Sequence, residues 1–411
     1  MIHPLPRALG LGLLIANLAG SCAVFSPQSQ AESAGSDERV LAGDAREELA
    51  IAPGTAQSAI AFADFIAEAQ GELEIPGVAV ALVYQDQILL LEGLGYRDLE
   101  QELPVTPHTL FHIGSTHKSM TAMLAAIAVD RGLYTWDEPI ITFAPEFELS
   151  DPEATATVTM RHLLSMRSGI SDELDAVEEL MPDDASTAQV SVSELFELVQ
   201  KIELLDSPGE VFEYSNVAVS LAGYLTTLAA VGSGAPLKSA HEILLEDWIL
   251  TPIGMNDAVL QWSDAQATGD VALPYIGESD RFVIAEREDF DGDILAPSGG
   301  LKASITDMAA YLITQVQGGI APNGERVVSA ENLAATWHPR RGDYAMGWEQ
   351  ETYQSVELLS HEGSFDNFLS VIGMIPEYEV GFVVLTNSSD AAADLIPEVG
   401  YELVDLLLEL E

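Results

Sequence analysis

The apolar residues at the start of the folded region recur first with helical and then with strand spacing. The segment 56–70, AQSAIAFADFIAEAQ, repeats apolar residues at intervals of three and four, which predicts a helix. The segment 77–98, GVAVALVYQDQILLLEGLGYRD, carries two apolar runs around the polar Gln85–Gln87, which predicts two strands joined by a turn. We therefore expect the folded domain to begin near Ala56.

The rest of the chain changes from helical to strand-like patterns and back. Residues from about 111 to 298 are mostly helical in pattern, with loops marked by Pro and Gly. Apolar β-branched residues return in 368–376 and 380–387, which predict strands, and 393–411 predicts a closing helix. This order suits an α+β fold, in which N- and C-terminal helices flank an antiparallel sheet and an all-helical lobe is inserted between the halves of the sheet.

Residues 1–22 have the pattern of a signal peptide. Arg7 precedes an apolar run that is too short to span a bilayer comfortably, and small residues follow it. Cys22, the only cysteine in the chain, ends the stretch LAGSC, which resembles a bacterial lipobox with Ala19 at the usual leucine position. Lipid attachment at Cys22 and ordinary cleavage nearby both stay open. Either one predicts export, to the cell envelope or the medium, and a mature protein with no internal disulfide.

The composition predicts an acidic tether and limits the partners of the domain. Residues 23–55 are rich in Ser, Ala, Gly and acids, which is typical of a flexible segment. The whole chain has 16 basic and 66 acidic residues, a net charge of −50. Such a surface repels nucleic acid and anionic membrane faces, so we expect neither as a partner, and contact with a membrane only through a lipid anchor.

Ser115 and Lys118 form the first candidate for chemistry. They lie in FHIGSTHKSM, at the start of an apolar helical pattern, and Lys118 is one of only four lysines. A serine there can simply cap the helix. However, the two residues are three positions apart and so lie on one helix face. A partly desolvated lysine there can also accept the serine proton and make the serine oxygen a nucleophile. Alone, this four-residue pattern is weak.

Two later stretches hold further candidates. Tyr214 and Asn216 lie in PGEVFEYSN. In one interpretation Asn216 caps a helix and Tyr214 packs in the core. In the other, both side chains face a cleft and contact a substrate. His361, Gly363 and Ser364 lead into a strand in HEGSFDNFLS. This stretch is either a polar hairpin corner or a strand edge at which the glycine admits a substrate and a backbone N–H stabilises an oxyanion.

Together the three stretches resemble the serine β-lactamase and penicillin-binding-protein superfamily. The nearest match is its class C-like branch, with D,D-peptidases, D-aminopeptidases and family VIII carboxylesterases. The motifs Ser-x-x-Lys, Tyr-x-Asn and Lys/His-x-Gly occur here in that order, and IPGVAVALV, VTMRHLLSMRSGI and YAMGWE add to the resemblance between Ile75 and Leu385. The resemblance implies one hydrolase domain over 56–411, with the active site between its two lobes.

The resemblance also implies a role for each matching residue. Ser115 is the nucleophile, Lys118 and Tyr214 move protons, and Asn216 orients the substrate. The backbone N–H groups of Ser115 and Ser364 form the oxyanion hole. His361 and Gly363 complete the third motif at the substrate. His361 departs from the lysine that is usual in β-lactamases, where it anchors the β-lactam carboxylate, and histidine is mostly uncharged near neutral pH.

The function that we expect from these residues is ester or amide hydrolysis through an acyl-enzyme at Ser115. A carboxylesterase or a D-amino-acid peptidase fits better than a β-lactamase, because His361 lacks a fixed charge. The alternative of another class is a catalytically silent wall-binding or sensor domain. We find no His-Glu-x-x-His motif and no Cys/His cluster, and therefore expect no catalytic metal and no cofactor. The substrate and the oligomeric state stay open.

Overall fold

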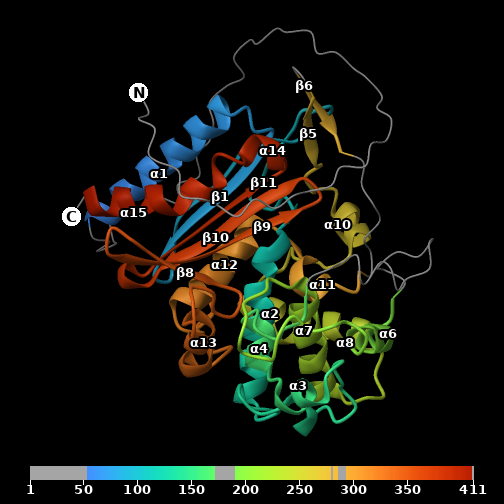
Figure 1. Cartoon of the computed structure of the whole chain (residues 1–411). Coiled ribbons are helices and arrows are strands. Elements are labelled where there is room, and N and C mark those ends of the chain that lie inside the picture. Colours follow the sequence, from blue (N-terminus) through green and yellow to red (C-terminus); the bar gives the residue numbers. More distant parts are fainter. Residues whose placement is uncertain (1–52, 172–189, 279–280, 286–292, 410–411) are drawn as a thin grey trace. The chain divides into compact units, whose positions relative to one another are not determined.

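The computed structural model describes residues 53–171, 190–278, 281–285 and 293–409, drawn as ribbon in Figure 1. The predicted signal peptide with Cys22, and the predicted tether up to residue 52, lie outside the described residues. In the part of the chain that is described, no helix is both long and apolar enough to cross a membrane.

A seven-stranded antiparallel sheet is the centre of the fold, with the strand order β3-β2-β1-β11-β10-β9-β8. The first and last long strands pair at its middle, with Val80 opposite Val384. Both strands are apolar along nearly their whole length and are buried on both faces, which their continuous runs of Val, Leu and Ala allow. The strands of the sheet are β1 (Gly77–Tyr84), β2 (Gln87–Asp98), β3 (Leu103–Pro104), β8 (Glu349–Tyr353), β9 (Val356–Phe365), β10 (Phe368–Ile375) and β11 (Val380–Thr386).

Helices from the two ends of the domain cover one face of this sheet. Figure 1 shows α1 (Pro53–Glu72) and α15 (Val399–Glu409) lying side by side across it. Phe62 and Leu403 of these helices pack with Phe382 of β11, and none of the three is exposed. The predicted α+β fold, with terminal helices flanking an antiparallel sheet, is therefore confirmed.

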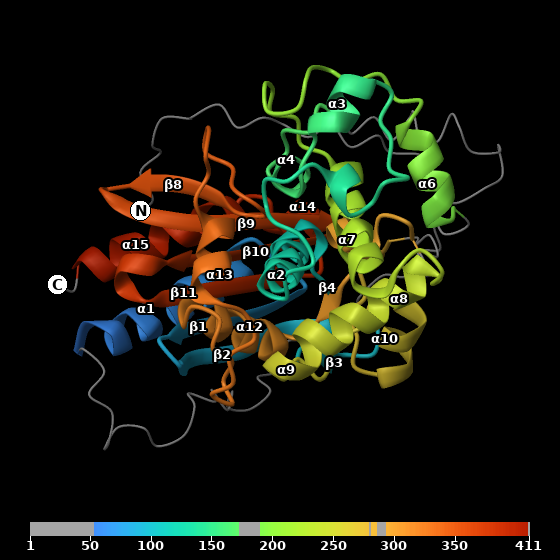
Figure 2. The ribbon, with the colours of Figure 1, turned by 90° about the horizontal axis from the view of Figure 1, so that it is seen from below.

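The opposite face carries α12 (Ile305–Val316) and the inserted lobe, as Figure 2 shows from below. At the centre of the lobe, α2 (Lys118–Asp130) packs against α7 (Asn216–Val231). Both helices are apolar nearly all round, as buried helices are. Around them lie α3 (Pro152–Thr157), α4 (Met160–Leu164), α6 (Val192–Val199), α8 (Leu237–Leu245), η4 (Glu246–Leu250), α9 (Thr251–Ile253), α10 (Trp262–Thr268), α11 (Ala296–Gly299) and α13 (Ala330–Trp337).

The structure corrects some details of the sequence prediction. The lobe is not all-helical: β4 (Phe111–His112) pairs with β7 (Lys302–Ala303), and β5 (Tyr275–Glu278) pairs with β6 (Arg281–Ile284). Aromatic and β-branched residues in β5 and β6 favour this hairpin. At the ends, α1 begins at Pro53 and so shortens the predicted tether, and the closing helix is divided at Pro397 into η6 (Ile396–Glu398) and α15.

Replacing Phe62 with alanine tests how strongly α1 holds to the sheet. Phe62 is fully buried, so Phe62→Ala leaves a cavity and is expected to lower the free energy of unfolding by about 3–5 kcal/mol, measured by urea denaturation. Ile60 on the same helix is 43% exposed, and Ile60→Ala is expected to change the free energy of unfolding by less than about 0.5 kcal/mol. Equal losses in the two variants would contradict this packing.

Candidate active site

Ser115 lies on a turn that leads directly into α2. The turn is the 3₁₀-helix η1 (Gly114–His117), and Lys118 is the first residue of α2. In a 3₁₀ turn, residues three apart lie one above the other, so the turn places the Lys118 side chain beside Ser115. Ser115 is therefore part of the helix start, but its hydroxyl is held by the lysine: Lys118 Nζ lies 2.9 Å from Ser115 Oγ.

Lys118 is completely buried, and oxygen atoms surround its nitrogen. Besides Ser115 Oγ, Lys118 Nζ donates to Asn216 Oδ1 at 2.6 Å and to the backbone oxygen of Ser298, in α11, at 2.9 Å. A neutral amine can donate to the latter two oxygens while its lone pair accepts the hydrogen of the Ser115 hydroxyl. The geometry therefore suits transfer of the serine proton to Lys118.

Asn216 and Tyr214 meet this lysine from the start of α7. Ser215 caps the helix, since its hydroxyl accepts the N–H of Ala218 at 3.1 Å. The Asn216 side chain is therefore not the cap, and its amide oxygen contacts Lys118 instead. The Tyr214 ring lies under the same nitrogen, with its centroid 4.8 Å from Lys118 Nζ. Residues almost 100 positions from Ser115 thus complete its surroundings.

The third predicted motif lies on β9, next to η1. A Cβ atom on Gly363 would lie 2.2 Å from the backbone oxygen of Ile113 and 3.1 Å from the backbone nitrogen of Ser115. Gly114 has φ +53°, and a Cβ there would lie 2.7 Å from the Ser364 nitrogen. Only glycine at both positions allows this approach. The approach brings the backbones around Ser115 and Ser364 together, as an oxyanion hole formed by the two N–H groups requires.

His361 is buried behind this edge, and both ring nitrogens form hydrogen bonds. Its Nε2 lies 3.0 Å from Tyr344 Oη, and its Nδ1 lies 2.5 Å from the backbone oxygen of Glu362. A carbonyl can only accept, so Nδ1 donates to Glu362 and Nε2 accepts the Tyr344 hydroxyl hydrogen. Burial, and then the positive charge that Lys118 carries when it is protonated, lower the pKa of His361 to about 3. This histidine is neutral and its nitrogens are occupied, so it does not present a positive charge to a substrate.

The sequence analysis missed two residues that hold these parts in place. Tyr344 bonds His361, and its ring meets the Tyr214 ring edge-on with 6.3 Å between centroids. Ser370, on β10, donates to the backbone oxygen of Ile113 at 2.8 Å and so ties the sheet to the segment before Ser115. Two sequence features could have pointed to these residues: the stretch YAMGWE for Tyr344, and a serine inside the apolar strand FLSVIGMI for Ser370.

The described residues contain no group of three or more His, Cys, Asp and Glu side chains that could hold a metal ion.

Comparison with known proteins identifies the family to which this fold and site belong. A sequence model described as Beta-lactamase matches residues 62–401. The chain belongs to the Beta-lactamase family. Among solved structures, an octameric penicillin-binding protein homologue from Pyrococcus abyssi superimposes with a TM-score of 0.69 and 27% identity, over 85% of this chain and 77% of that one. The class C beta lactamase of Rhodobacter sphaeroides has a TM-score of 0.65 and 21% identity, over 86% and 99%, which shows a shared fold.

Two curated relatives resemble the chain over most of its length. Protein flp of Staphylococcus aureus (strain MW2) is 25% identical over 80% of this chain and 64% of its own. Unguisins hydrolase ungD' of Aspergillus campestris (strain IBT 28561) is 26% identical over 85% of this chain and 65% of its own. The chain thus spans just under two thirds of the length of each relative. The predicted resemblance to the serine β-lactamase and penicillin-binding-protein superfamily is confirmed.

The lowered pKa of His361 predicts a specific pH dependence of stability. Between the ordinary value of 6.5 and about 3, the unfolded chain holds a proton at this side chain that the folded chain lacks. Within this window, the free energy of unfolding therefore falls by about 1.4 kcal/mol for each unit by which the pH is lowered. His361→Gln is expected to reduce the slope of unfolding free energy against pH by that amount, measured by denaturation between about pH 4 and 6.

The exposed His338 offers the matched control, because His338→Gln removes a histidine outside the site. This control should keep the slope of the unmodified protein, because the side chain it removes is exposed to solvent. An unchanged slope in His361→Gln would show that His361 is not buried in the neutral form.

Proposed function

We propose that the protein is an exported serine hydrolase that cleaves ester or amide bonds through an acyl-enzyme at Ser115. The observation that carries this proposal is the 2.9 Å contact between Ser115 Oγ and a completely buried Lys118 Nζ. A buried lysine at hydrogen-bonding distance from a serine is the arrangement of a nucleophile with its base. Membership of the Beta-lactamase family and a relative named as a hydrolase support the same reaction type. Export rests on the signal-peptide pattern of residues 1–22.

Acylation begins when Lys118 accepts the hydroxyl proton of Ser115. The serine oxygen then forms a bond to the carbonyl carbon of the substrate, and the negative charge passes to the carbonyl oxygen. The N–H groups of Ser115 and Ser364 stabilise this oxyanion. As the tetrahedral intermediate collapses, the bond to the leaving group breaks, and Lys118 returns the proton, directly or through Tyr214, to the departing oxygen or nitrogen.

Deacylation repeats these steps with water as the nucleophile. Water loses a proton to the Lys118 and Tyr214 pair and attacks the acyl carbon, and Ser115 leaves with that proton. Asn216 has its amide oxygen on Lys118, and its amide N–H₂, which can donate hydrogen bonds, is the group that we assign to orienting the substrate. The product is a free carboxylic acid, and the enzyme returns to its starting state.

We propose further that an esterase or D-amino-acid peptidase activity exceeds any β-lactamase activity. The supporting observation is the environment of His361, whose pKa is lowered to about 3 and whose nitrogens are bonded to Tyr344 and Glu362. A β-lactam carboxylate therefore finds no cation at the position where β-lactamases usually carry lysine. Neutral esters and amides do not need that cation.

Covalent labelling tests the nucleophile without knowledge of the substrate. A fluorophosphonate probe is expected to add one label at Ser115, detected by peptide mass spectrometry. Ser115→Ala should abolish the label, and the exposed Ser233→Ala should keep it. Lys118→Met should slow labelling by about 10²–10⁴-fold, because the base is lost. Absence of a label on the folded, unmodified protein would support a silent wall-binding or sensor domain instead.

A panel of substrates tests the preference. We expect Ser115-dependent turnover of a short-chain p-nitrophenyl ester, a D-amino-acid amide or a D-alanyl-D-alanine peptide, and little turnover of a chromogenic cephalosporin. The comparison is kcat/KM for each compound, with Ser115→Ala as the blank. Faster turnover of the cephalosporin than of every other compound would show that a neutral His361 does not limit β-lactam hydrolysis.

A further inference from the structure

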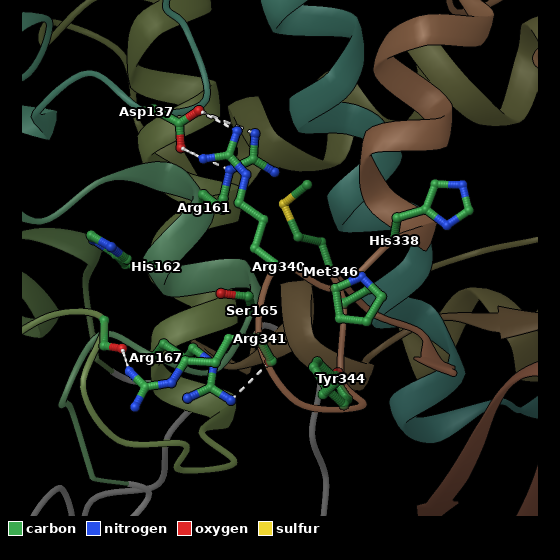
Figure 3. A pocket seen from close by; sticks show the side chains of 13 residues that line it. Asp137, Arg161, His162, Ser165, Arg167, His338, Arg340, Arg341, Tyr344 and Met346 are labelled. Carbon is green, nitrogen blue, oxygen red and sulfur yellow. Dashed lines mark hydrogen bonds and ion pairs between the residues drawn. The ribbon is translucent and has the colours of Figure 1, made fainter. Parts of the chain in front are cut away.

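A pocket lined by arginines lies beside the candidate active site, on the side of Tyr344 (Figure 3). It has a volume of about 160 Å³ and is formed by the segment that contains α4 and by the segment 338–346. Four arginines line it, in a chain with only 16 basic residues and a net charge of −50. They are Arg161, Arg167, Arg340 and Arg341.

One end of this arginine pocket is largely neutralised. Arg161 donates to Asp137 at 2.8 and 3.3 Å, and Arg340 donates to the same carboxylate at 3.0 and 2.9 Å. Figure 3 shows both guanidinium groups gathered on Asp137. One carboxylate thus serves two arginines, and this end keeps an excess of one positive charge.

The other end holds two arginines with little compensation. Within the described residues Arg167 forms no ion pair, and its Nε is buried without a hydrogen-bond partner. Arg341 meets Glu210 only at 3.7 Å, where both side chains are exposed. His162, which also lines the pocket, has a buried Nδ1 with no partner among the described residues.

The other hydrogen bonds of these two arginines go to backbone oxygens, and the Arg167 guanidinium also lies 5.8 Å from the centre of the Phe212 ring. Arg167 Nη2 donates to the Arg341 oxygen at 2.9 Å, and Arg341 Nη1 donates to the Gly209 oxygen at 2.9 Å. These bonds attach the 338–346 segment to its neighbours, but they neutralise no charge. Burial, and then the charge of Arg341, lower the pKa of Arg167. Two guanidinium groups therefore repel each other across the pocket.

An oxyanion would remove this repulsion. The planar guanidinium group matches the oxygens of phosphate, sulfate and carboxylate, and such charge-assisted hydrogen bonds are stronger than neutral ones. The carboxylates spread over the rest of the protein repel anions at long range. At about 0.15 M ionic strength, however, charges more than about 8 Å away are largely screened, whereas contacts inside the pocket are not.

We propose that this arginine pocket is a binding site for an oxyanion group, held between Arg167 and Arg341. The group is a phosphate, sulfate or carboxylate, either free or carried on a larger ligand. Tyr344 lines the pocket and also contacts His361 and Tyr214, so one side chain connects the proposed anion site to the candidate active site. Binding here does not depend on the hydrolytic function proposed above.

Isothermal titration calorimetry of the full chain tests the proposal. Sodium phosphate, sodium sulfate and sodium acetate are titrated separately, at one constant ionic strength set with sodium chloride. We expect saturable heat for at least one of the three anions. Arg167→Gln and Arg341→Gln are each expected to weaken its binding by about tenfold or more. The anion that binds most tightly shows whether the site prefers a tetrahedral or a planar anion.

Lys201→Gln is the matched control, because it removes one positive charge from an exposed position outside the pocket. This control should bind the anion as the unmodified protein does. Arg341 is exposed, so Arg341→Gln remains informative even where Arg167→Gln impairs folding. The proposal is overturned by the absence of saturable binding for all three anions, or by equal affinities in the arginine variants and in Lys201→Gln.

Discussion

The burial of one amine is the constraint on which the rest of the site depends. A lysine nitrogen removed from water is stable only where polar atoms replace its hydration. Lys118 has no exposed surface, and its nitrogen contacts a hydroxyl, an amide oxygen and a backbone oxygen from three separate elements. The start of α2, the start of α7 and α11 must therefore converge on this nitrogen. The same convergence that keeps the lysine buried also places it beside the serine.

Close backbone contact joins this lysine site to the sheet. Gly114 and Gly363 face one another across η1 and β9, and any side chain at either position would overlap backbone atoms. Ser370 adds a hydrogen bond from the next strand to Ile113. The sheet is rigid at this point because β9 is paired with β10 from Leu359 to Phe365. A rigid strand that touches the turn of Ser115, the proposed nucleophile, can hold two backbone N–H groups at a fixed spacing, as an oxyanion hole requires.

Charge is distributed in this protein in a way that its net value of −50 conceals. The candidate active site contains a buried lysine and a neutral histidine, whereas the arginine pocket concentrates positive charge nearby. The sequence analysis treated the acidic surface as a whole and expected it to repel nucleic acid and anionic membrane faces. The structure limits that interpretation locally, since four arginines from two segments of the chain line one pocket. Among the described residues, Asp137 pairs with two of them and the exposed Glu210 lies near a third.

The sequence by itself determined the features that depend on neighbours along the chain. The periods of apolar residues predicted α1, β1, β2, β10 and β11, and the spacing of Ser115 and Lys118 predicted their contact, because residues three apart on a helical turn must lie together. Family resemblance added Tyr214, Asn216 and Gly363, which the structure brings close to Ser115.

Only the tertiary structure decided what depends on distant segments. Whether His361 is charged follows from its burial and from Tyr344, and neither can be read from the letters around it. The β5–β6 hairpin and the arginine pocket depend in the same way on how remote segments pack. Local sequence fixes backbone preference and period, whereas burial, pKa and the meeting of charges arise only when the chain has folded.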